Sequence, residues 1–258
     1  MNALRVLAAD YPVIFELSLT IVGFVGLLLV TGVAYHRLGK AHGDGIMAMV
    51  RLVLTAGLLL LVWHLGGLEA SGITRLGSWQ VWLLALGGML YFASAGLYAF
   101  YGKLAFSVSS IIRLPAARRV ILTQIVPVPY EEILFRGVVL YVLFRTWGHT
   151  RTGTIGSVLL PAVLFAIPHL IAVFMGTSLS ATLLLVVEGC IIAVWWGALV
   201  LWGGSLWPAV LLHYVVNVVI AVQDLTVPMV TPDTLAYRRI LWFSTPLGAL
   251  GVGLLAQV

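Results

Sequence analysis

Charged side chains are scarce in this chain. Only 9% of its 258 residues are Asp, Glu, Lys or Arg, whereas 62% are hydrophobic, and the mean hydropathy is +1.11. A water-soluble globule of this length needs more polar side chains than this to cover its surface. The composition therefore excludes a soluble domain and predicts an integral membrane protein that crosses the bilayer several times.

Cysteine is almost absent as well. The chain contains one, Cys190, which lies within an apolar run. A single thiol cannot form a disulfide framework or a thiolate metal cluster within one chain, so the sequence excludes both. We interpret Cys190 as a small buried side chain.

What the chain has in abundance is long apolar runs. A helix needs about 20 apolar residues to cross a hydrocarbon core of ~30 Å. Runs of this kind, without the alternation typical of barrel strands, fall near 12–35, 47–68, 80–101, 119–145, 154–175, 180–202, 205–223 and 237–256. The sequence predicts an all-α, polytopic membrane protein with about eight transmembrane helices in one bundle. We expect residues 1–258 to form a single membrane domain.

Basic residues are distributed unevenly between the two ends of these windows. Nine lie at the connections after the first, third and seventh windows, and four lie at the opposite ends. Under the positive-inside rule this bias predicts that both termini are outside the cytoplasm. The net charge of +5 then reflects topology and contact with the lipid bilayer, and we expect no nucleic-acid partner. We expect the protein to be a multi-pass protein of the cytoplasmic membrane of a prokaryote.

A few ionisable side chains interrupt the apolar windows. A charge at the centre of a bilayer costs at least ~3 kcal/mol on insertion scales, so such residues mark candidate functional sites. Those deep in the windows are Glu131, Glu132, Arg136, His169, Glu188 and His213. Residues four apart share a helix face, which pairs Glu132 with Arg136 and places Asn217 beside His213. If the three windows that carry them pack together, these groups meet near the middle of the membrane.

This set of side chains contains the groups that a hydrolase needs. A carboxylate in a low-dielectric pocket can act as a base toward water, and an imidazole beside it can deliver the proton to a leaving amine. A second imidazole and a carboxamide can donate hydrogen bonds to the developing oxyanion. Two adjacent carboxylates in different environments suggest different roles, in which Arg136 keeps one of them ionised and structural.

Three blocks of these residues follow one another along the chain, each in a separate apolar window. They are Glu131-Glu132-x-x-x-Arg136, Phe165-x-x-x-His169 and His213-x-x-x-Asn217. Together they resemble the signature of the CPBP family, which comprises the CAAX prenyl proteases and the bacteriocin-processing enzymes of the Abi type. The resemblance covers about residues 119–220. It implies an eight-helix intramembrane endopeptidase.

The resemblance also implies a role for each matching residue. Glu131 and His169 would activate water, and His213 and Asn217 would stabilise the oxyanion. Glu132 and Arg136 would hold the site in shape. We expect Phe165 to shield the cluster on one side, and Pro168 to kink its helix and make room for substrate.

Several alternatives remain open on the sequence alone. Spacing does not separate a metal-free glutamate mechanism, which the resemblance favours, from a zinc site formed by Glu131, His169 and His213. A proton-coupled transporter, or a non-proteolytic immunity or scaffold protein of the same family, could also use this cluster. Glu188 matches no block, so both a supporting role and a simple polar contact are open. As substrate we expect a membrane-anchored or lipidated polypeptide.

Overall fold

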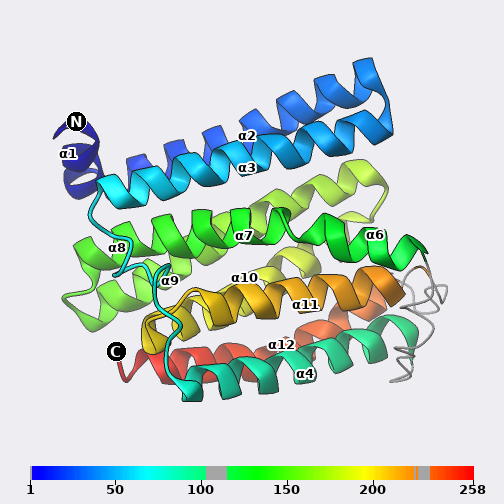
Figure 1. The fold of residues 1–258 in the computed structure, drawn as a ribbon. Helices are drawn as coiled ribbons and strands as arrows, with labels where there is room; N and C mark the ends of the chain where they lie inside the picture. Colours follow the sequence, from blue (N-terminus) through cyan, green and yellow to red (C-terminus); the bar gives the residue numbers. More distant parts are fainter. Residues whose placement is uncertain (1, 103–114, 224, 226–232) are drawn as a thin grey trace.

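The protein is mainly helical in the part of the chain that its computed structural model describes, residues 2–102, 115–223, 225 and 233–258. Within these residues there is no strand (Figure 1). The elements are α1 (Asn2–Asp10), α2 (Pro12–Leu38), α3 (Lys40–His64), α4 (Trp79–Tyr101), α6 (Pro115–Gln124), α7 (Pro127–Glu132), the π-helix η1 (Ile133–Val139), α8 (Leu140–Trp147), α9 (Arg151–Ala166), the 3-10 helix η2 (Ile167–Met175), α10 (Leu179–Gly203), α11 (Trp207–Gln223) and α12 (Asp233–Leu255). The predicted all-α class is confirmed.

Five helical segments of the described residues are long and apolar enough to cross a membrane. They are Pro12–Val30, Gly45–His64, Trp79–Ala99, Arg151–Met175 and Leu179–Gly203, and α11 is a shorter apolar helix. The two other predicted windows are also helical, but 119–145 is divided among α6, α7, η1 and α8, and α12 carries two arginines near its start. The chain is thus an integral membrane protein, and the predicted number of eight spans is approximate.

The helices pack as a bundle with α10 near its centre. On one side α2 and α3 form an antiparallel pair, and on the other side α4 packs against α11 and α12 (Figure 1). The consecutive helical segments α6, α7, η1 and α8 lie between these two groups. Helix α9 packs beside α8 and α10. Both termini lie at the same end of the bundle (Figure 1). Which side of the membrane this end faces stays a prediction, and residues 103–114, whose basic side chains contributed to it, lie outside the described part of the chain.

Polar side chains and glycines set the ends of the helices next to the bundle's core. The Thr150 hydroxyl accepts a hydrogen bond from the Gly153 N–H at 3.0 Å and caps the start of α9. Ser178 caps α10 in the same way through the Ala181 N–H. Gly204 ends α10 with φ 61°, a left-handed conformation that glycine adopts without strain.

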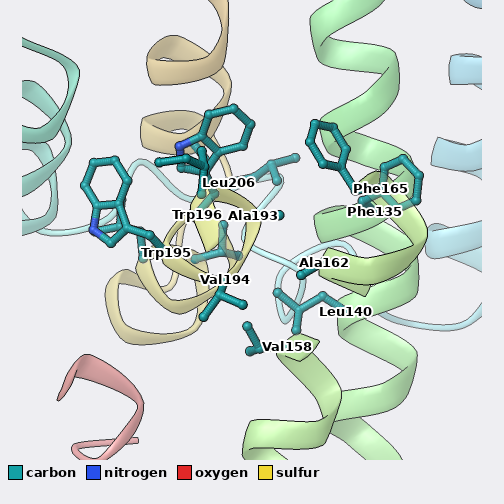
Figure 2. Close-up of a cluster of buried hydrophobic side chains, with 14 of the residues drawn as sticks. Phe135, Leu140, Val158, Ala162, Phe165, Ala193, Val194, Trp195, Trp196 and Leu206 are labelled. Atoms are coloured by element: carbon teal, nitrogen blue, oxygen red, sulfur yellow. The ribbon is translucent and has the colours of Figure 1, made fainter. Parts of the chain in front are cut away.

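The core lies where α10 meets α9 and the π-helical segment. Trp195 and Trp196 of α10 lie in a cluster with Phe135, Phe165 and their neighbours (Figure 2). Helix α4 approaches α10 at Gly88, where a Cβ atom would collide with the Trp195 ring. By contrast, the outer faces expose large apolar side chains, which suits contact with lipid rather than water.

Candidate functional site

The segment with the paired glutamates is not the continuous α-helix that the window 119–145 predicted. α6 ends at Gln124 and α7 begins at Pro127, because proline lacks the N–H that would continue the ladder of hydrogen bonds. Directly after Glu132 the backbone widens into the π-helix η1, all of whose residues are buried. Single π turns within helices are frequent at functional sites. Here the irregular backbone aligns the first motif with the core.

Glu132 and Arg136 form a buried ion pair. Arg136 Nη1 donates to Glu132 Oε1 at 2.9 Å, and the two side chains are 2% and 0% exposed. The Arg136 guanidinium also lies over the rings of Phe165 and Trp196, at 4.5 and 5.2 Å from their centroids. Cation–π contacts of this kind add to the stability of a desolvated charge. The spacing of four residues predicted this pair, and its geometry is that of a structural ion pair.

His213 lies between the two glutamates. Its Nδ1 is 2.8 Å from Glu132 Oε1, and its Nε2 is 3.9 Å from Glu131 Oε2. Glu132 Oε1 also accepts from Arg136, so we assign Nδ1 of His213 as the donor of this hydrogen bond, which orients the imidazole ring. Nε2 is then directed toward Glu131, the more accessible carboxylate, whose side chain is 22% exposed.

The gap between Nε2 of His213 and Oε2 of Glu131 is wide enough for a bridging water molecule. At 3.9 Å the two atoms are too far apart for a direct hydrogen bond, but one water molecule can contact both at ~2.8 Å. Such a water would have a carboxylate to accept its proton and an imidazole stabilised by a second carboxylate beside it. A carboxylate and an oriented imidazole within reach of one water molecule are groups that can catalyse hydrolysis.

His169 lies beside the same Phe165 ring that His213 contacts. It belongs to η2, which begins at Ile167 with Pro168 in its first turn, so the expected distortion at Pro168 takes the form of a change from α- to 3-10 helix. Its Nδ1 is 3.2 Å from the Ala166 carbonyl oxygen. Phe165 contacts both imidazoles, with centroid distances of 5.6 Å to His169 and 5.7 Å to His213. His169 makes no ion pair with Glu131 or Glu132 in the described structure.

Asn217 lies one helical turn beyond His213 on α11. Its Nδ2 donates to Oε1 of Gln124 at 3.5 Å, a long hydrogen bond that leaves the carboxamide free to reorient. Gln124 is the last residue of α6 and was not among the predicted site residues. In the sequence, Gln124 is noticeable only as a single carboxamide side chain within an apolar window, seven residues before the first motif.

A cavity of about 350 Å³ connects several of these groups. His169, His213, Asn217, Gln124 and Glu188 line it, together with mostly apolar side chains of α4, α10, α11 and α12. The arrangement is typical of a substrate pocket, in which a few polar groups converge within an apolar wall. It brings together the second and third motifs, and the first reaches it through the contacts of His213.

Trp196 is a further neighbour whose position the sequence did not predict. Its ring stacks on His213 with a centroid distance of 4.6 Å and an interplanar angle of 29°. Trp196 lies in the hydrophobic core. The stacking in addition fixes the plane of the imidazole.

The structure does not group the three residues that were considered as zinc ligands around one point. Within the described ranges, no three His, Cys, Asp or Glu side chains are grouped so that they could hold a metal ion. Glu131, His169 and His213 all belong to these ranges, and the Phe165 ring contacts both imidazoles. The residues present therefore do not fit the predicted three-ligand zinc site.

A known protein family matches the part of the chain that contains the three motifs. The family model described as Type II CAAX prenyl endopeptidase Rce1-like matches residues 114–219. The match covers less than half of the chain and contains the part in which the motifs lie. All three motifs lie within the match, so the predicted resemblance to CPBP intramembrane proteases is confirmed. No curated protein and no solved structure matches the chain.

The match to the Rce1-like family bears on the general activity. It supports a CAAX-type protease within the membrane, and such a protease acts on a polypeptide substrate that reaches the bilayer. Together with the apolar helices, it accounts for the placement of polar groups inside the bundle.

Proposed function

We propose that this Rce1-like protein is an endopeptidase that hydrolyses a peptide bond of a membrane-anchored or lipidated polypeptide by direct attack of water. The observation that carries the proposal is the position of His213, which binds Glu132 through Nδ1 and directs Nε2 toward Glu131. Beside it, an apolar cavity of about 350 Å³ with convergent polar groups offers room for the residues next to the scissile bond.

In the proposed reaction Glu131 is the general base. It accepts a proton from the water molecule that contacts both Glu131 and His213, and the oxygen of that water attacks the scissile carbonyl carbon. The carbonyl π electrons move to oxygen and form an oxyanion. The proton then passes to the leaving amine as the C–N bond breaks.

His213 and Asn217 are the proposed oxyanion donors. Glu132 orients the His213 ring through Nδ1, and in the proposed step Nε2 carries a proton that it donates to the oxyanion. The Asn217 amide has only a 3.5 Å hydrogen bond to Gln124 to give up when it turns toward the substrate.

His169 is the proposed second proton carrier. It lines the same cavity as His213 and contacts the Phe165 ring. From there it can assist proton transfer to the leaving amine once substrate fills the cavity. Glu132 and Arg136 act through His213 and do not contact the substrate.

The test compares cleavage of lipidated and membrane-anchored peptides by protein in liposomes. Glu131→Gln keeps the size of the side chain but cannot accept a proton, so we expect cleavage to fall below detection while folding is unchanged. Glu69→Gln is the matched control, because Glu69 is an exposed carboxylate near Arg75 and outside the site. Equal activity of Glu131→Gln and the control would refute the assignment of the base.

A non-proteolytic member of the family would behave differently. Such a protein would bind the peptides without producing new termini, and the Glu131→Gln variant would bind as the wild type does. Mass spectrometry of the peptides after incubation distinguishes the two outcomes.

A further inference from the structure

Glu188 is a buried acid that the proposed reaction does not use. It lies near the middle of α10, is 7% exposed, and lines the cavity that also contains His169, His213 and Asn217. The three motifs do not include it. Among the described residues that line the cavity, Glu188 is the only one with an acidic side chain.

The protein offers Glu188 only weak compensation for its burial. Ser244 Oγ is 3.3 Å from Glu188 Oε1, but the same hydroxyl is 2.8 Å from the Ile240 carbonyl oxygen. A hydroxyl has a single proton, and the shorter contact competes for it. No Lys or Arg side chain of the described residues forms an ion pair with Glu188.

An acid in this position needs a partner. Burial of an unpaired carboxylate is costly, and ionisable groups inside membrane proteins are retained where they act on a substrate, an ion or a proton. The wall around Glu188 is apolar, with Phe92, Leu185, Ile192 and Val216 among its residues. A ligand that fills this cavity therefore gains most from apolar side chains together with one cationic group.

We propose that Glu188 binds a basic side chain of the substrate and so selects polypeptides with Lys or Arg close to the scissile bond. This inference depends on the proposed function for the identity of the ligand as a polypeptide. The cavity is small, about 350 Å³, and is shared with the imidazoles, which limits the basic residue to the immediate neighbourhood of the bond that is cleaved.

The experiment uses sets of lipidated peptides that differ at one position and carry Lys, Met or Glu there. Met approximates the length of Lys without its charge. Wild-type protein in liposomes should cleave the Lys peptide on the order of 10- to 100-fold more efficiently, in kcat/KM, than the Met peptide at one position of the scan. Glu188→Gln, which keeps the shape and the contact with Ser244, should reduce this preference to a few-fold at most.

Charge reversal gives a second readout. Glu188→Lys should favour the Glu peptide over the Lys peptide, which a merely structural role of the residue would not produce. Glu16→Gln is the matched control: Glu16 is a buried acid of α2 outside this cavity, so its replacement should leave the preference for Lys intact. If Glu188→Gln lowers cleavage of all three peptides by the same factor, or if the wild type does not discriminate among them, the inference is wrong.

Binding to the Glu131→Gln variant separates this inference from the proposed function. Tighter binding of the Lys peptide that disappears in Glu131→Gln/Glu188→Gln supports the role of Glu188 even if no peptide is cleaved by the wild type. Cleavage without any preference for Lys supports the peptidase and refutes the role of Glu188. Absence of both cleavage and selective binding contradicts both.

Discussion

Replacement of Arg136 tests the electrostatic account of the site most directly. In Arg136→Met an apolar side chain of similar length takes the place of the guanidinium, which loses the 2.9 Å ion pair with Glu132 and the contacts with two aromatic rings. Removal of one partner from a buried pair costs ~3–5 kcal/mol, because the other charge stays buried without compensation. The hydrogen bond from His213 remains and keeps the loss toward the lower end of that range.

The expected loss is large enough to measure in detergent. At about 2–4 °C per kcal/mol, the melting temperature should fall by on the order of 10 °C. The nine tryptophans provide a fluorescence signal for unfolding. Arg75→Met is the matched control, since Arg75 is 59% exposed and lies 4.0 Å from Glu69, a geometry typically worth less than about 1 kcal/mol.

A double variant separates charge from shape. Glu132→Gln/Arg136→Met removes both charges and retains an acceptor for His213, so it should recover most of the lost stability while cleavage stays impaired. A single variant as stable as the Arg75→Met control would refute the buried pair. A double variant as unstable as the single would show that the packing of Arg136, rather than its charge, stabilises this region.

Four further outcomes follow from the fold and the proposed mechanism. Asn217→Ala should lower kcat by about 10²–10³-fold with the fold intact, and an undiminished rate would remove this residue from the oxyanion site. Gly88→Val should destabilise the bundle by ~1–3 kcal/mol, because a Cβ atom at this position would already collide with the Trp195 ring. A Cβ atom at Gly87 meets nothing within 4 Å, so Gly87→Val should be tolerated, and equal Tm values for the two variants would contradict this packing. Prolonged chelation should leave cleavage unchanged, and activity that chelation abolishes and zinc restores would overturn the metal-free proposal. Reporters fused after Val258 and inserted at Gly39 should lie on opposite sides of the membrane, and the same side for both would contradict the order of the helices.

The sequence determined those features that depend on composition and on neighbours along one helix. Scarce charge and long apolar runs were sufficient to predict an all-α membrane protein. A surface that faces lipid needs no polar side chains, and a helix satisfies its own backbone hydrogen bonds inside the bilayer. The ion pair of Glu132 and Arg136 followed from their spacing, since residues four apart meet on any helix. The three ordered motifs were sufficient for the family.

Only the tertiary structure decided which helix faces meet. His213 is 81 residues from Glu132 in sequence, and helical periodicity alone could not indicate that its Nδ1 would bind Glu132 while Nε2 is directed toward Glu131. The same holds for Glu188 and Gln124, which are single polar residues without a motif until packing places them in one cavity with Asn217. The rotation of each helix about its axis results from the fit of many side chains at once, and no short segment of the sequence contains that information.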